Sequence, residues 1–229
     1  MSPIYIWCDI QDYIPNENTL VYYPLDTENT VNDLSGHNYT LTKTGNVSFW
    51  TYQWVDCAWF TSNWGSSWEC WMYRSSDTII APQSTDLTFH VWLYKWSESM
   101  YYNPRIIWKY WSSWAVFTYA SCNRISTWDS TSYWVIPDND AWFLFSCAYK
   151  YSDKTWAYYK NWTYVDTQTN SGPSWNSNSW IILWTRDNLW TGYWDKWSGA
   201  MSRVIIENRL WNATDISNYY NLTKWNYWL

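Results

Sequence analysis

Alternation of side chains is the feature that most limits what this chain can fold into. Short runs of β-branched and aromatic residues recur, separated by clusters of Ser, Asn, Asp and Thr. In the clearest run, residues 86–94, one face carries Leu87, Phe89, Val91 and Leu93, and the other carries Thr88, His90, Trp92 and Tyr94. A period of two is typical of a β-strand. Many short strands with turns between them predict an all-β fold, an antiparallel β-sandwich of the jelly-roll type.

Eight further runs of this composition are expected to be strands: 19–24, 38–43, 104–109, 114–119, 142–150, 155–160, 179–184 and 200–207. One short helix is expected near the C-terminus, because Thr214 can act as an N-cap and Ile216, Tyr219 and Tyr220 follow at helical spacing. We divide the chain into an N-terminal strand and linker (1–18) and a β-sandwich domain (19–229).

Charge and hydropathy exclude two classes of partner. The net charge of −6 gives no basic field for a phosphate backbone, so no nucleic-acid partner is expected. No apolar run approaches the length of a membrane span, so no membrane insertion is expected. The first residues lack the basic and apolar regions of a signal peptide, so none is expected there.

Five segments resemble, in order, the laminin G-like domains of the concanavalin A-like lectin/glucanase superfamily. The opening motif is matched by LVYYPLDTENTVNDLSG (20–36), and a Trp-containing strand by TFHVWLY (88–94). The next hairpin is matched by RIIWKY with WAVFTY (105–119), and the later motifs by residues 141–165 and 202–221. The resemblance covers roughly residues 19–221 and implies the same sandwich fold.

Tryptophan and glycine contents depart from that family. The chain has 26 Trp and only 6 Gly. The family has a turn Asn-Gly where this chain has Asn161-Trp162, and a Gly where this chain has Trp184. The type I′ turn of a β-hairpin favours Asn-Gly because both of its central residues take positive φ. Further Trp residues lie among turn-forming neighbours: Trp64, Trp96, Trp111, Trp175, Trp194 and Trp197.

One hypothesis joins the excess of Trp to the deficit of Gly. Some bacteria and their phages read the codon UGA as glycine, whereas another translation table renders it as tryptophan. Many of the Trp residues are then glycines in the protein as it is made. The alternative is a protein that is truly rich in Trp. Trp92 and Trp142 are expected to be genuine, because they fall where the family has Trp on strands.

The resemblance implies that glycans are bound by loops at one end of the sandwich or on its concave sheet. Aromatic faces stack on sugars there, while Asn and Asp bind hydroxyl groups. Tyr101, Tyr102 and Asn103 form one such loop, and Tyr193 and Asp195 belong to another.

Calcium is the ion that the resemblance implies, held at one edge of the sandwich. Asp33 and Asn38, in the turn NDLSGHN, supply oxygen ligands of the right type. The alternative is an Asx-turn capped by Asp33, with a purely structural role.

Catalytic groups are not evident in the sequence. Glycoside hydrolases need two carboxylates on one face, and two pairs have i, i+2 spacing, Asp26 with Glu28 and Asp138 with Asp140. Both pairs lie in turn-like contexts, so they are expected to cap turns. The glucanase pattern E-x-D-x-x-E is absent. We therefore expect no enzymatic activity.

The expected function is non-catalytic binding of carbohydrate or another cell-surface ligand, as part of a phage virion or a bacterial surface protein. The expected location is extracellular or on a virion surface, and homo-oligomers or virion assembly are the further partners considered. Two alternatives stay open, a glycan-active hydrolase of the same superfamily and a structural decoration module of a tail or capsid.

Overall fold

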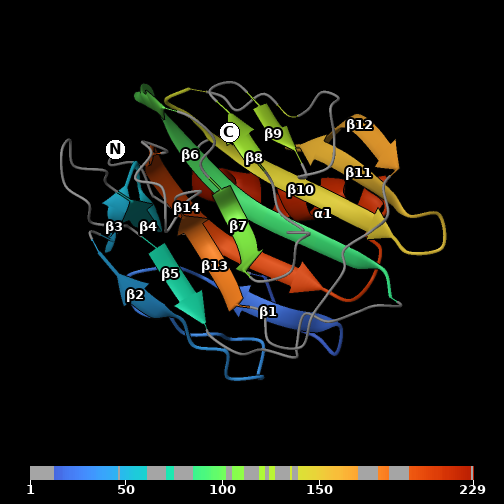
Figure 1. Ribbon diagram of the computed structural model, residues 1–229, viewed down its shortest axis with the longest axis horizontal. Helices are drawn as coiled ribbons and strands as arrows, with labels where there is room; N and C mark the ends of the chain where they lie inside the picture. Colours follow the sequence, from blue (N-terminus) through green and yellow to red (C-terminus); the bar gives the residue numbers. More distant parts are fainter. Residues whose placement is uncertain are drawn as a thin grey trace, which may run out of the picture.

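Two antiparallel β-sheets packed face to face, with a helix behind the larger one, make up the fold (Figure 1). The computed structural model describes residues 13–45, 47–60, 71–74, 85–101, 105–110, 119–121, 124–126, 135, 139–169, 180–185, 196–227 and 229. The predicted all-β sandwich with one short C-terminal helix is confirmed. Within the described residues, no helix has the length and apolar character that crossing a membrane requires.

The larger sheet contains, in spatial order, β12 (Thr163–Thr169), β11 (Thr155–Lys160), β10 (Trp142–Lys150), β6 (Leu87–Tyr101), β14 (Lys196–Glu207), β4 (Val55–Phe60) and β3 (Val47–Tyr52). One side of β14 pairs with β6. Its other side pairs first with β4 and then with β1 (Thr19–Tyr23). The smaller sheet contains β2 (Thr42–Thr44), β5 (Trp71–Arg74), β13 (Trp180–Thr185), β7 (Arg105–Tyr110), β8 (Tyr119–Ser121) and β9 (Arg124–Ser126).

Most of the expected strands exist. The runs 19–24, 86–94, 104–109, 142–150, 155–160, 179–184 and 200–207 correspond to β1, β6, β7, β10, β11, β13 and β14. The strand expected at 38–43 is wrong over its first part, because Asn38 takes a φ of 66° in a turn and pairing starts at Thr42. The run 114–119 lies, except for its last residue, outside the described residues.

The β3–β4 hairpin was not foreseen. Its sequence, VSFWTYQWVDCAWF (47–60), is mostly aromatic and apolar and has no Gly, Pro or Asn to mark a turn. The chain nevertheless reverses at Gln53 and Trp54, and Tyr52 pairs with Val55 across a two-residue loop. A turn without turn-forming residues is therefore what hid this hairpin from sequence reasoning.

The helix α1 (Ala213–Thr223) begins two residues earlier than predicted, because the prediction placed its N-cap at Thr214. Asn212 is the N-cap, and its Oδ1 accepts hydrogen bonds from the amides of Thr214 and Asp215. Asp215 Oδ2 in turn accepts from the amide of Asn212, which completes a capping box. A 3₁₀ turn, η1 (Lys224–Tyr227), follows directly.

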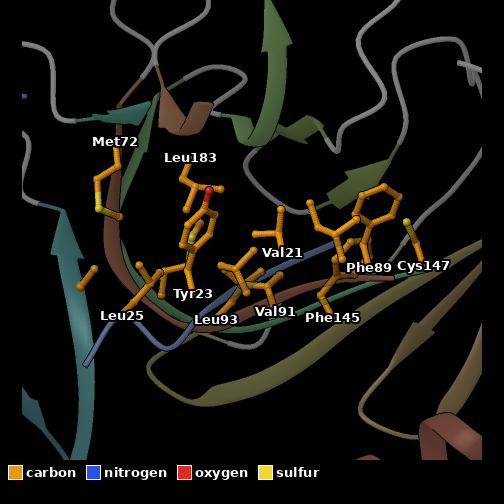
Figure 2. Packing of buried hydrophobic residues seen from close by; sticks show 14 of the residues in the cluster. Val21, Tyr23, Leu25, Met72, Phe89, Val91, Leu93, Phe145, Cys147 and Leu183 are labelled. Carbon is orange, nitrogen blue, oxygen red and sulfur yellow. The ribbon is translucent and has the colours of Figure 1, made fainter. Parts of the chain in front are cut away.

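The main core lies between the two sheets. Leu87, Phe89, Val91 and Leu93 of β6 belong to it, as the alternation predicted. Figure 2 shows Met72 and Leu183 of the smaller sheet reaching toward Tyr23, Val91 and Leu93 of the larger one. Cys147 of β10 is also buried in this cluster and forms no disulfide.

A second cluster covers the outer face of the larger sheet. Trp92 and Tyr94 belong to it, so the two faces of β6 divide as the sequence indicated. The ring of Trp92 stacks on Tyr227 of η1 with centroids 3.8 Å apart and planes 11° apart. In Figure 1 α1 lies behind β10, which is consistent with the burial of Ile216 and Tyr220 in this cluster. The helix and η1 therefore bury part of the outer face of the larger sheet in a second core.

Candidate ligand-binding surface

Five aromatic side chains gather on the part of the outer face formed by β3, β4 and β6. We call this group the aromatic surface: Trp50, Tyr52, Trp59, Tyr94 and Trp96. Strand register places them there, because Ala200 of β14 pairs with Trp59 on one side and with Tyr94 on the other. The small side chain of Ala200 leaves room for both rings, whose centroids are 6.2 Å apart.

The rings of this surface form one connected group. Trp59 lies at its centre, with ring centroids 4.9 Å from Tyr52 and 5.6 Å from each of Trp50 and Trp96. The contacts with Trp50 and Trp96 are edge-to-face, at 87° and 69°. Edge-to-face packing is a favoured arrangement of aromatic pairs, so these contacts hold the rings in defined orientations.

Exposure divides the aromatic surface into two levels. Trp59 and Tyr94 are buried at the sheet, whereas Trp50 is 47% and Trp96 43% exposed. Exposed indole rings held in place by a buried third ring offer large, rigid apolar faces to a ligand. Hydrophobic groups that are left in water on a monomer commonly mark a binding surface when they are contiguous.

Polar groups adjoin the aromatic surface. The hydroxyl groups of Tyr52 and Tyr94 lie 3.1 Å apart and share a hydrogen bond. Burial, followed by the Tyr52 hydroxyl and the carboxylate of Asp140, raises the pKa of Tyr94 above its ordinary value. Tyr94 therefore stays a neutral hydroxyl, and Asp140 is an exposed acceptor close to it.

The loop residues expected to bind a ligand are placed only in part. Tyr101 is the last residue of β6 and pairs with Lys196, the first residue of β14. The two predicted loops therefore leave the sheet from neighbouring positions, one after Tyr101 and the other before Lys196. Tyr102 and Asn103, together with Tyr193 and Asp195, lie outside the described residues, so their role stays a prediction.

Asp33 is buried and acts as the organiser of a turn. Its Oδ1 accepts hydrogen bonds from the amides of Tyr22 and Ser35, and its Oδ2 accepts from the Ser35 hydroxyl and the Tyr39 amide. Four donors on one carboxylate tie β1 to the following turn. This is the Asx-turn arrangement that the sequence left open beside a calcium site.

Asn38 has an exposed side chain, and its backbone carbonyl oxygen accepts a hydrogen bond from the guanidinium group of Arg74 at 2.7 Å. Among the described residues, no three His, Cys, Asp or Glu side chains come together as a metal site. Calcium at Asp33 and Asn38 stays a prediction.

The first pair of closely spaced carboxylates, Asp26 with Glu28, occupies a turn. Asp26 Oδ1 accepts hydrogen bonds from the amides of Glu28 and Asn29, as expected of a turn cap. Asp138 is outside the described residues, and Asp140 lies in a bend with a φ of 55°.

A buried carboxylate that the sequence did not indicate lies at the end of β14. Glu207 is fully buried, and its Oε1 accepts from the Tyr13 hydroxyl and from Asn16 Nδ2 at 3.2 Å. Its Oε2 accepts from Arg209 Nε and Trp211 Nε1. Burial raises the pKa of this carboxyl, but the hydrogen bonds from Tyr13, Arg209 and Trp211 outweigh it and leave the pKa lowered. Glu207 therefore ties the described N-terminal residues to β14 and to the start of α1.

His90 is the second buried titratable group on this face. Its Nδ1 shares a hydrogen bond of 2.8 Å with Ser146 Oγ, and its ring packs against Trp211 at 4.1 Å and against Tyr219 at 5.4 Å. Its Nε2 is buried without a hydrogen-bond partner. Burial lowers the pKa of His90 from 6.5 to about 3; the charge of Glu207 opposes this shift and that of Arg209 adds to it. Aromatic rings cover His90, so its role is structural.

Acid is expected to destabilise the fold through His90. Because the pKa of His90 is lower in the folded protein than in the unfolded chain, the unfolded chain binds its proton first, and stability falls as the pH drops below about 6.5. Between pH 6.5 and 5, the free energy of unfolding should fall by about 2 kcal/mol. Urea unfolding at both pH values measures this loss. The variant His90→Gln should lose much less over the same interval, and an equal loss in both proteins would contradict this assignment.

Solved structures with a similar fold include binding domains of botulinum neurotoxins. One similar structure is described by the statement that cell entry of botulinum neurotoxin type C is dependent upon interaction with two ganglioside molecules. Its TM-score is 0.70 and its sequence identity to this chain is 15%. The match covers 89% of this chain and 51% of that one. The binding domain of botulinum neurotoxin DC in complex with rat synaptotagmin II has a TM-score of 0.67 and a sequence identity of 14%. The match covers 89% of this chain and 51% of that one. The binding domain of Paraclostridial Mosquitocidal Protein 1 has a TM-score of 0.67 and a sequence identity of 13%. The match covers 89% of this chain and 52% of that one.

These similarities concern the fold. At 13–15% identity they show that the chain adopts the same kind of β-sandwich as part of those domains, and it spans about half of their length. No family model matches the chain, and no curated protein matches its sequence.

Proposed function

We propose that this domain is a non-catalytic module that binds carbohydrate on a cell surface, and that the aromatic surface carries the ligand. The observation behind this proposal is the contiguous set of exposed rings around Trp59. The fold supports it, since similar structures are named for ganglioside-dependent cell entry and for a complex with SialylT.

The chemistry of the aromatic surface suits a sugar. A pyranose ring has an apolar face of C–H groups that stacks on an aromatic ring, and hydroxyl groups around its rim that need donors and acceptors. The exposed rings supply the first, and the hydroxyl group of Tyr52 and the exposed carboxylate of Asp140 supply the second. The negative net charge opposes a highly anionic ligand, so a neutral or weakly acidic glycan fits best.

Replacing Tyr52 tests the proposal. Tyr52→Ala removes a ring 4.9 Å from Trp59 together with a hydroxyl group, so affinity for the glycan should fall about tenfold, or about 1.4 kcal/mol. Tyr52→Phe keeps the ring and should lose less. The measurement is a glycan-array screen of the purified chain, followed by calorimetric titration of the best glycan with each variant.

A matched control is available on the same sheet. Tyr164 of β12 is an exposed tyrosine, whereas Tyr52 is half-buried, and it lies on the edge strand opposite β3. Tyr164→Ala should leave the affinity unchanged. Absence of any glycan bound by the wild-type chain, or equal losses in Tyr52→Ala and Tyr164→Ala, would overturn the proposal.

We place the domain, as part of the same proposal, on the outside of a cell or a virion, as a laminin G-like module. The order of the five sequence motifs supports the family, and the cell-entry role named for a similar structure supports the location. Genes for tail or capsid proteins next to its own gene would support a phage particle, and neighbouring genes for cell-envelope proteins would support a bacterial surface.

A further inference from the structure

Two hairpins of the larger sheet close through loops of two residues, and each loop has Trp in second place. β3 and β4 are joined by Gln53 and Trp54, and β11 and β12 by Asn161 and Trp162. Two-residue loops of this kind favour Asn-Gly, because their backbone twist matches that of the strands only when φ is positive. In both loops, Trp therefore stands where glycine is the favoured residue.

The backbone at Trp54 takes the conformation that glycine favours. Gln53 has a φ of 48° and Trp54 a φ of 67°, and positive φ at both central residues is the mark of a type I′ turn. In the other loop Asn161 has a φ of 58°, whereas the φ of Trp162 is not positive. Bulky residues rarely take positive φ, because the Cβ atom then crowds the backbone, whereas glycine takes it without strain.

The side chains at both loops are mostly exposed and gain little from burial. Trp54 is 81% and Trp162 57% exposed, so each indole is left largely in water. The position of each ring thus lacks the packing that normally favours a Trp residue.

The other Trp residues whose side chains are described show that this is not a general property of the chain. Five are 0–5% exposed, namely Trp59, Trp92, Trp142, Trp156 and Trp211. Each of these has defined partners, such as Tyr149 against Trp156 at 4.6 Å and Glu207 on Trp211 Nε1. Trp50, Trp54, Trp96, Trp162 and Trp225 are 43–81% exposed. No described Trp side chain lies between these two groups, so the residue type occurs in two distinct environments.

We infer that positions 54 and 162 are glycines in the protein as its natural source makes it, encoded by UGA, and that the five buried positions are true tryptophans. This goes beyond the ligand-binding proposal and does not rest on it, because positions 54 and 162 are not part of the aromatic surface. Glycine accounts for the positive φ at position 54 and, at both positions, for the two-residue loop and the exposure of the indole. The turn after Tyr52 then reads Gln-Gly and the turn after Lys160 reads Asn-Gly.

Peptide mass spectrometry of the protein recovered from its natural source tests this directly. One peptide that spans residues 47–60 contains both Trp54 and Trp59 and so carries its own control. The expected result is the mass of glycine at position 54 and of tryptophan at position 59. Tryptophan at position 54, or a UGG codon there in the gene, would overturn the inference.

Stability measurements on the chain with Trp at both loop positions provide a second test. Trp54→Gly should raise the urea midpoint of unfolding, because the strain of a positive φ is relieved and little buried surface is lost. Trp162→Gly, where φ is not positive, should leave the midpoint unchanged or raise it. The matched change Trp59→Gly, in the same hairpin, should lower the midpoint or prevent folding. A fall of the midpoint in both loop variants would count against glycine at those positions, and glycan binding is not needed as a readout.

Discussion

Replacing Trp92 by alanine should lower the free energy of unfolding by about 3–5 kcal/mol, a large share of the stability of a domain of this size. Trp92 is fully buried between the larger sheet and the C-terminal segment. Its ring stacks on Tyr227 at 3.8 Å and lies 5.9 Å from Tyr220. Alanine would leave a cavity under η1 and the end of α1, where rigid strands limit collapse.

The measurement is equilibrium unfolding in urea, followed by far-ultraviolet circular dichroism and by fluorescence. Trp225→Ala provides the matched control, since Trp225 lies in η1 but is exposed. Its loss should stay within about 0.5 kcal/mol. If the two variants lost equal stability, the helix would not depend on Trp92 for its packing.

Replacing Glu207 by glutamine should lower the free energy of unfolding by about 2–4 kcal/mol. Each carboxylate oxygen accepts hydrogen bonds from donors: Tyr13 and Asn16 on one, Arg209 and Trp211 on the other. The glutamine amide keeps one acceptor oxygen, but its NH₂ group replaces the other oxygen and faces the two donors that this oxygen had accepted from. Those donors lose their partners, and the Arg209 guanidinium loses its counter-charge.

The pH dependence of this variant distinguishes it from a packing defect. Because the pKa of Glu207 is lowered on folding, the stability that its charge provides is present above the ordinary pKa of 4.5 and is lost as the pH falls through the folded value. Glu207→Gln should therefore remove part of the acid sensitivity below pH 4.5. The exposed carboxylate of Glu17 supplies the control, because Glu17→Gln makes the same chemical change and should have little effect. Equal losses in the two variants would contradict the assigned role of Glu207.

The two clusters on the larger sheet show how far sequence reasoning reached. The alternation in residues 86–94 predicted which side chains of β6 share a face, and both sets occupy the faces expected. The covering of the second face was not predicted. It depends on where residues 212–227 return after β14, and a period of two says nothing about long-range contacts.

The aromatic surface, in contrast, was not predicted from the sequence. Trp50, Tyr52 and Trp59 were not grouped in advance, since residues 47–60 lack the turn signals from which a hairpin is predicted. Tyr94 and Trp96 lie some 40 residues further along, and strand register joins them to Trp59 through Ala200. Register across three strands is set by packing of the whole sheet, so the aromatic surface could not be derived from local sequence.

The sequence by itself determined the fold class, about half of the described strands and the unusual balance of Trp and Gly, because these follow from local alternation and composition. Only the tertiary structure separated the Trp residues into buried and exposed groups, buried His90 and Glu207, and brought five rings onto one face. Burial and contact between distant residues arise when strands pair and sheets stack, and these long-range steps are decided by the packing of the entire chain.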